Sequence, residues 1–217
     1  MKKLYWEKFS GLLNMKYFLQ GPFEMDVIDF DDTSMFRLAA TLDNVSVFEN
    51  VNMLPRALVV HRATVTSTQD ALFDVLRSDS FDPATAVVLE EEVPAEVLAL
   101  LDDAPLSDAS VATIREYKPR SVTIDADMEH AGFLILADTY YPGWKVFVDG
   151  EEKELYAADY IARGVFLPEG HHEVQFVYAP LSFKVGAWLS LITLALVAVA
   201  AIADRSLRKL ANAAPSP

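Results

Sequence analysis

The sequence predicts a mainly β protein with minor α content, held in a membrane by one C-terminal transmembrane helix. After residue 110, short apolar segments alternate with turn residues, which is typical of antiparallel β-strands. Nineteen consecutive uncharged residues then run from Val185 to Ala203. We therefore expect an antiparallel β-sandwich-like domain, preceded by a small mixed α/β segment and followed by a membrane span.

The uncharged segment is long enough to cross a bilayer as a helix. At about 1.5 Å per residue it extends roughly 28 Å, close to the thickness of the hydrocarbon core. Arg205, Arg208 and Lys209 follow it closely, whereas Lys184 alone precedes it. This excess of positive charge predicts a cytoplasmic C-terminus and an extracytoplasmic domain in a bacterial cytoplasmic membrane.

The first residues do not explain how such a domain would be exported. Lysines interrupt the apolar residues near the start, so residues 1–8 do not resemble a signal peptide. Two explanations stay open. Either membrane helices of a longer polytopic protein precede this region, which we favour, or the domain is cytosolic and tail-anchored against the charge rule.

Charge and composition exclude several classes of function. The net charge is −14, and 14 of the 18 cations and 31 of the 32 acids precede residue 184, so residues 1–183 carry about −17. A domain this acidic repels nucleic acid, so we exclude nucleic-acid binding. Cysteine is absent, which rules out disulfides and thiolate metal sites. We expect neither a cofactor nor a metal.

Residues before 110 predict a mixture of helix and strand. Apolar residues between 4 and 19 have a ragged helical spacing, which suggests a short juxtamembrane or interfacial helix. A second helix is expected at Thr68–Arg77, capped by Ser67 or Thr68, and a third at Ala95–Leu101. Short strands are expected between Phe36 and Val60, most clearly at Ala57–Val60, and at Ala86–Leu89.

Six strands are predicted after residue 110. They are Ala112–Tyr117, Ser121–Asp125, Phe133–Ala137, Lys145–Val148, Gly164–Leu167 and Glu173–Tyr178.

Two dipeptides between these strands predict specific turns. Pro142-Gly143 suits the central positions of a type II turn, and Asp149-Gly150 suits a hairpin turn of the primed kind. In the last strand, Val174, Phe176 and Tyr178 should share the core face. The resulting organisation is a juxtamembrane segment 1–20, a mixed α/β region 21–110, a β-sandwich region 111–183, a transmembrane helix 184–204 and a cytoplasmic tail 205–217.

An ordered series of short motifs resembles the YfhO-like bacterial membrane proteins. The C-terminal part contains Tyr141-Pro142-Gly143-Trp144, Val148-Asp149-Gly150, Arg163-Gly164-Val165-Phe166-Leu167-Pro168, Gly170-His171 and Phe176-Val177-Tyr178-Ala179-Pro180. Upstream, Asn14-Met15-Lys16-Tyr17, Phe48-Glu49-Asn50 and Leu54-Pro55-Arg56-Ala57 resemble further elements of the family. Each motif is short, but their order is the same along most of the chain.

The resemblance implies a function in the cell envelope. Members of the family are large polytopic proteins similar to lipid-phosphosugar-dependent glycosyltransferases of the GT-C kind, implicated in glycosylating cell-envelope polymers. In such enzymes the catalytic acid lies in an early extracytoplasmic loop, so no catalytic residue is assigned here. The expected partners are the lipid bilayer, a polytopic membrane core and a cell-envelope glycan.

Four residues are candidates for glycan binding. Tyr140, Tyr141 and Trp144 surround the Pro-Gly turn, where aromatic rings can stack on sugars, although burial in the end of the sandwich is the more common use of such rings. Arg163 suits a phosphate or an acidic sugar, or equally a neighbouring carboxylate.

Other polar residues are interpreted structurally. Asp149 is more typical of a turn than of a catalytic acid. His171 and His172 are consecutive in a strand, point to opposite faces and cannot share one metal ion.

Three functions remain open. The first is a non-catalytic extracytoplasmic module of a YfhO-like glycosyltransferase. The second is a free-standing membrane-anchored protein that binds glycans or acts as a scaffold. The third, least favoured, is a hydrolase with paired carboxylates.

Overall fold

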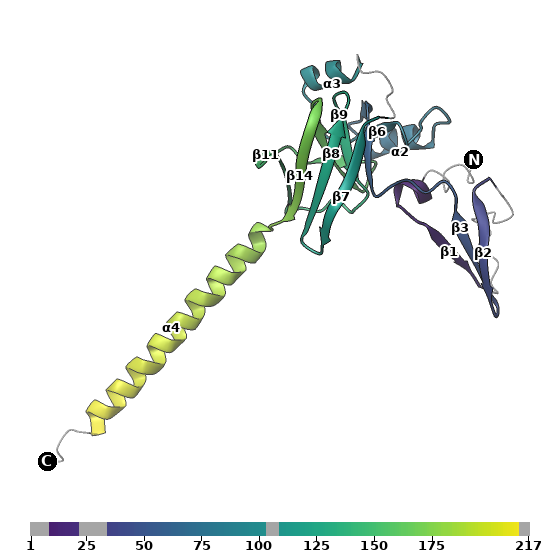
Figure 1. Cartoon of the computed structure of the whole chain (residues 1–217). Helices are drawn as coiled ribbons and strands as arrows, with labels where there is room; N and C mark the ends of the chain where they lie inside the picture. The colour runs from purple at the N-terminus through teal and green to yellow at the C-terminus, as the bar shows by residue number, and fades with distance from the viewer. Residues whose placement is uncertain (1–8, 22–33, 103–108, 213–217) are drawn as a thin grey trace. The chain divides into compact units, whose positions relative to one another are not determined.

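The computed structural model describes residues 9–21, 34–102 and 109–212 (Figure 1). The chain divides into two compact units, Met1–Tyr178 and Ala179–Pro217. The described part of the first unit contains three β-sheets and two α-helices, α2 and α3, besides a helical turn at residues 9–12, and the second unit contains the long helix α4, Leu181–Asn212. The predicted mainly β fold with one C-terminal apolar helix is confirmed.

A small sheet of three strands precedes the sandwich in sequence. Its order is β1 (Tyr17–Gln20), β3 (Val45–Asn50) and β2 (Phe36–Leu42), and both pairings are antiparallel. Phe18, Met35 and Phe36 are buried together and form a core on one side of this sheet. The strands predicted between Phe36 and Asn50 therefore exist, in a sheet separate from the other two.

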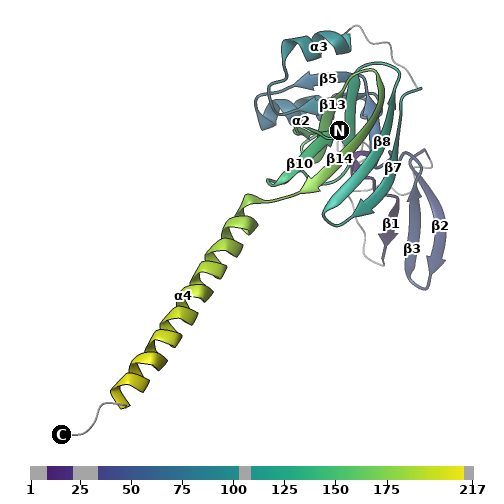
Figure 2. The ribbon, with the colours of Figure 1, turned by 60° about the vertical axis from the view of Figure 1, so that its left-hand side comes forward.

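The two larger sheets contain the remaining strands. The five-stranded sheet has the order β11 (Glu151–Lys153), β10 (Trp144–Val148), β14 (Gly170–Tyr178), β8 (Ser121–Met128) and β7 (Val111–Lys118). The six-stranded sheet has the order β4 (Ala57–Val60), β9 (Gly132–Leu136), β13 (Ala162–Leu167), β12 (Tyr156–Ala158), β6 (Ala86–Leu89) and β5 (Arg62–Val65). Figure 2 shows β7, β8 and β14 side by side, as the pairing requires.

The main core lies between the two larger sheets, which confirms the sandwich-like architecture. It combines Ile124 and Phe176 of the five-stranded sheet with Leu134 and Leu167 of the six-stranded sheet, all fully or almost fully buried. Along β14, buried and exposed residues alternate, as expected for a strand with one face in the core. Val174 and Phe176 are fully buried, and Tyr178 at the end of the strand is half-buried.

Two helices cover residues of the six-stranded sheet. Helix α3 (Ala95–Asp102) contributes Leu101 to a second core that contains Phe133 of β9. Helix α2 (Gln69–Arg77) buries Leu72 and Leu76 against Val88 of β6.

Both helices agree with the sequence. The Thr68 hydroxyl accepts a hydrogen bond from the Ala71 amide at the start of α2, so Thr68 is the cap of the two predicted candidates, Ser67 and Thr68. Helix α3 confirms the short helix predicted at Ala95–Leu101.

The predicted helix over residues 4–19 is wrong in its second half. Residues 9–12 are helical, Asn14 has φ of 53°, and Tyr17–Gln20 form β1, while residues 4–8 lie outside the described part. Side chains in β1 alternate between buried and exposed, because the segment pairs with β3. The pairing partner is about thirty residues away in sequence, and a local spacing argument does not detect it.

Three further strands were not predicted, and one pairing is parallel. Strands β5, β11 and β12 have three or four residues each. Strands β5 and β6 are parallel, joined by the connection that contains α2. The six-stranded sheet thus unites strands from before and after residues 90–110, the stretch where the composition changes.

Candidate functional site

A cluster centred on the Asp138 carboxylate joins residues from distant parts of the chain. Asp138 follows β9, Arg163 lies on β13, Arg56 directly precedes β4, and Tyr117 lies on β7. Asp138 Oδ2 is 3.2 Å from Arg163 Nη2, and its Oδ1 is 2.9 Å from Arg56 Nη1. The Tyr117 hydroxyl lies 2.9 Å from Asp138 Oδ2. One carboxylate therefore connects two arginines and a tyrosine from both sheets.

Arg163 is the buried member of this cluster. Its side chain is 4% exposed, and its Nε donates a hydrogen bond to the Asp138 carbonyl oxygen at 3.3 Å. Its Cζ lies 3.8 Å from the centroid of the Trp144 ring, so the guanidinium stacks on the indole. Nη1 is buried without a hydrogen-bond partner. Burial lowers the pKa of Arg163, and the Asp138 charge opposes that change.

The three aromatic residues proposed to stack on sugars have different contacts in the structure. Trp144 lies between Arg163 and Tyr178, whose ring centroid is 5.3 Å away. Tyr140 is half-buried, and its hydroxyl donates a hydrogen bond to Glu91. Burial, and secondarily the Glu91 charge, raise the pKa of Tyr140.

Tyr141 differs from these residues because it is 60% exposed. The structure thus brings Trp144 and Arg163 into contact, directs Tyr140 toward Glu91, and leaves Tyr141 accessible to a ligand.

The Pro142-Gly143 segment is a tight turn that leads into β10. The Trp144 amide donates to the Tyr141 carbonyl at 3.3 Å, and Gly143 has φ of 104°. A positive φ at the third residue is what a type II turn requires. The turn places Trp144 at the start of β10, directly opposite Tyr178 of β14.

The Asp149-Gly150 turn joins β10 to β11. Both residues have positive φ, 52° and 84°, as a type I′ turn requires. Asp149 Oδ1 accepts a hydrogen bond from the Glu173 amide at 2.9 Å, and its Oδ2 is 2.7 Å from His172 Nδ1. The hydrogen bond with His172, followed by that from Glu173, lowers the pKa of Asp149. This carboxylate ties the turn to β14.

The two consecutive histidines face opposite sides of β14. His172 is buried and lies against Asp149, whereas His171 is exposed and its Nδ1 is 2.6 Å from Asp127 Oδ1. The Asp127 carboxylate raises the pKa of His171 through this contact. In residues 9–21, 34–102 and 109–212, no three His, Asp or Glu side chains are grouped so that they could hold a metal ion.

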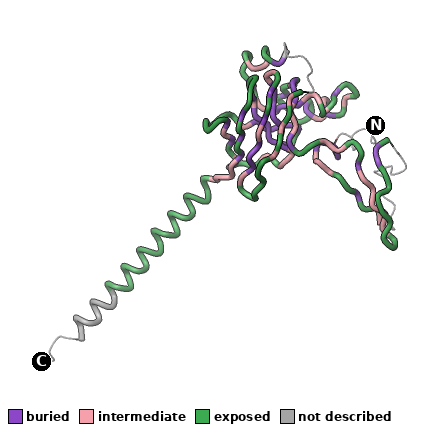
Figure 3. The backbone as a smooth tube through the Cα atoms, viewed as in Figure 1, coloured by how far each residue is buried: buried purple, intermediate pink, exposed green. Residues whose placement is uncertain are grey.

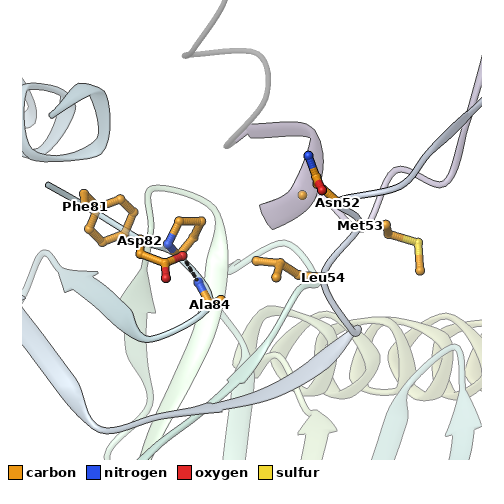
Figure 4. Close-up of a pocket in the computed structure, with 8 residues that line it drawn as sticks. Asn52, Met53, Leu54, Phe81, Asp82 and Ala84 are labelled. Carbon is orange, nitrogen blue, oxygen red and sulfur yellow. Dashed lines mark hydrogen bonds between the residues drawn. The ribbon is translucent and has the colours of Figure 1, made fainter. Parts of the chain in front are cut away.

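A groove of about 510 Å³ lies beside the segment before β4 (Figure 4). It is lined by Gly11, Asn52, Met53, Leu54, Phe81, Asp82, Pro83 and Ala84. The Asp82 carboxylate accepts a hydrogen bond from the Ala84 amide at 3.0 Å, so it is engaged in its own turn. No sequence signal pointed to this groove, because its lining comes from three separate segments.

Sequence reasoning missed Arg56, Tyr117 and Asp138 as members of a site. Arg56 was noted only within its Leu-Pro-Arg-Ala motif, and Asp138 lies two residues before the predicted tyrosines. A cation next to a buried apolar strand is a signal for a paired carboxylate. The sequence does not say which of its 32 acids is the partner.

The fold and the helix together define a class of protein. Residues Leu181–Ala203 form a 23-residue apolar segment of α4 that is long enough to span a membrane, and none of it is buried. By its length and composition this segment is a candidate membrane span, and it follows a β-sandwich domain in the sequence.

Comparison with known families makes this more specific. The family model described as bacterial membrane protein YfhO matches residues 106–190, which extend from before β7 into α4. The resemblance inferred from the C-terminal motifs is thus confirmed over residues 106–190. No curated protein and no solved structure gave a significant match.

Proposed function

We propose that the chain is a non-catalytic extracytoplasmic module of a YfhO-like membrane glycosyltransferase that modifies cell-envelope polymers. The observation that carries the proposal is that two residues of the family motifs, Trp144 and Arg163, make contacts inside the domain. Arg163 and Trp144 stack on each other, and Arg163 pairs with Asp138 away from solvent. These contacts stabilise the end of the sandwich and leave Arg163 no access to a substrate.

The orientation is part of the proposal. Arg205, Arg208 and Lys209 follow the apolar segment, and positive residues near a span favour the cytoplasmic side. The domain before α4 would then lie outside the cytoplasm, and preceding membrane helices of a longer protein would deliver it there. A polytopic core is the expected partner and would supply the catalytic acid.

Cysteine labelling tests the orientation directly, because the chain has no cysteine of its own. Asp79→Cys places a thiol on an exposed position of the domain, and Ser216→Cys places one in the tail. In intact spheroplasts a membrane-impermeant maleimide should label position 79 and should reach position 216 only after permeabilisation. The reverse pattern would contradict the extracytoplasmic location.

Transfer assays test the non-catalytic role. The purified full chain is mixed with polyprenyl-phosphosugar and envelope polymer, and radiolabel is followed into the polymer. We expect no transfer above a sample without protein, because the catalytic apparatus would belong to the membrane core. Reproducible turnover would contradict the proposal and make the domain's own carboxylates candidates.

Glycan binding by an independent anchored protein is the second candidate, favoured by the exposed ring of Tyr141. Stacking on this ring would be lost in Tyr141→Ala, so binding on a glycan array should disappear. Tyr17→Ala removes a ring of similar exposure on the three-stranded sheet and is the matched control. Binding that survives Tyr141→Ala but not Tyr17→Ala would place the glycan elsewhere.

A further inference from the structure

The three-stranded sheet has an apolar face that is exposed in the described part of the chain. We call it the outer face. Its members are Tyr17 and Leu19 of β1, Val45, Val47 and Glu49 of β3, and Arg37, Ala40 and Leu42 of β2, as the register places them opposite one another. Leu19 is 67% exposed, Leu42 is 65% exposed and Tyr17 is 52% exposed. Figure 3 shows the turn between β2 and β3 as exposed.

The opposite face of this sheet has the reverse character near the β2–β3 turn. Phe18 and Phe36 are buried in the core of the sheet, with ring centroids 5.2 Å apart, whereas Leu38 on the same face is 56% exposed. Closer to the turn, the same face carries the polar residues Gln20, Ser46 and Thr41. Polar side chains thus occupy the part of the core-bearing face closest to the turn, while leucine and valine occupy the outer face. An exposed apolar face of this kind marks a surface that binds a partner.

We infer that the outer face docks on the lipid bilayer in which α4 lies. The polarity of the face suits the boundary between headgroups and acyl chains. Leu19 and Leu42 lie toward the β2–β3 turn, and the row of Tyr17, Glu49 and Arg37 crosses the other end of the sheet. The ammonium group of Lys16 lies 5.3 Å from the Tyr17 ring centroid. Amphipathic rings and cations bordering an apolar surface are typical of proteins that insert into this boundary.

Local charge separates this sheet from the rest of the domain. Residues 15–20 and 34–54 contain two cations, Lys16 and Arg37, and two acids, Asp43 and Glu49, whereas the connecting residues 21–33 contain five acids and no cation. Residues 1–183 as a whole carry about −17. The strands and their flanking residues are thus neutral, but the sequence that joins β1 to β2 is acidic, so charge does not attract this sheet to anionic lipids. Its binding would come from apolar burial rather than from charge.

A second copy of the chain is the less suitable occupant. Pairing two outer faces would bring together two domains of about −17 each, and their repulsion opposes association. The bilayer is in contrast always available, because α4 tethers the domain to it and raises its effective concentration. This inference requires the membrane span but not the proposed side of the membrane.

Site-specific fluorescence in a bilayer tests the docking. Leu19→Cys, Leu42→Cys and Thr41→Cys each introduce a single thiol for an environment-sensitive NBD label. Thr41 is exposed and adjacent to Leu42, but it lies on the opposite face, so it is the matched control. The labelled full chain is reconstituted in phosphatidylcholine vesicles with and without nitroxide-labelled lipid. Circular dichroism melting confirms that each labelled protein is folded.

The docked sheet should give a blue shift and nitroxide quenching at positions 19 and 42, with neither effect at position 41. Unshifted, unquenched emission at all three positions would show the outer face in water and overturn the inference. A blue shift at 19 and 42 without nitroxide quenching would show a protein partner and also overturn it. The nitroxide lipid is present in both leaflets, so quenching does not depend on which side of the membrane the domain occupies. The docking result is therefore independent of the labelling pattern at positions 79 and 216.

Discussion

The sandwich and the three-stranded sheet have similar alternating sequences but use them differently. In the sandwich, the side chains of Val174 and Phe176 on β14 face the other large sheet and are fully buried. In the three-stranded sheet, the apolar side chains of Leu19 and Leu42 face outward. An alternating pattern therefore specifies that a face is apolar, whereas the presence of a second layer decides whether that face becomes a core or a surface for a partner.

The largest expected effect lies at the buried pair of the sandwich. Asp138→Ala leaves the Arg163 guanidinium buried without its counter-ion, which should lower the free energy of unfolding by about 3–5 kcal/mol. Asp125→Ala removes the half-buried partner of the exposed Arg115 and should cost about 0–1 kcal/mol. Chemical denaturation of the full chain in detergent, followed by far-UV circular dichroism, compares the two. Equal losses in the free energy of unfolding would mean that burial does not make the Asp138–Arg163 pair more important for stability than the Asp125–Arg115 pair.

The second effect depends on pH and concerns a buried carboxyl group. Asp159 is 3% exposed, and burial raises its pKa to about 7, while the hydrogen bond from the Val88 amide opposes the shift. An unfolded aspartate has a pKa of about 3.9, so the native state holds the proton more tightly. The free energy of unfolding should therefore fall by about 4 kcal/mol as pH rises from roughly 4 to 7.

Asp159→Asn isolates this contribution. The amide cannot ionise but keeps an oxygen that can accept the hydrogen bond from the Val88 amide. The difference in stability between the variant and the parent should grow in favour of the variant up to pH 7 and then stay constant. Parallel pH profiles of the two proteins would contradict a raised pKa at this position.

A smaller effect is expected at the turn that positions Trp144. Gly143→Val puts a β-branched residue at φ of 104°, which should destabilise the domain by about 1–3 kcal/mol. Asn accepts positive φ more readily, so Gly143→Asn should lose less stability than Gly143→Val. An unchanged melting temperature for the valine variant would contradict the turn assignment.

The smallest effect should occur on the outer face. Leu42→Gln changes an exposed side chain and should alter the free energy of unfolding in detergent by less than about 0.5 kcal/mol. Phe18→Ala, on the buried face of the same sheet, should cost about 3–5 kcal/mol. A large loss in the free energy of unfolding for Leu42→Gln in detergent would mean that this leucine supports the fold. The apolar side chains of the sandwich and of the outer face would then both stabilise the domain.

Much of the site was accessible from the sequence only as separate pieces. The Pro-Gly turn and the strand from Gly164 to Leu167 follow from local composition, whereas the exposure of Tyr141 and the inclusion of Arg163 in that strand do not. The convergence of Arg56, Tyr117 and Arg163 on Asp138 does not, because these residues are 21 to 107 positions apart in the chain. Local patterns therefore identified side chains that could bind a ligand, but not the residues that these side chains contact. In the structure the contacts of Arg163 are with Asp138 and Trp144 inside the domain.

By itself the sequence determined the features that depend on neighbouring residues. The helix after Ser67-Thr68, the long strands of the sandwich and the apolar segment of α4 are set by local hydrogen bonds, by a period of two or by continuous hydrophobicity. The tertiary structure alone decided that residues 17–20 form a strand, that β5 and β6 pair in parallel, and that the outer face is exposed. These features depend on contacts between segments far apart in the chain, whose energies no local window contains.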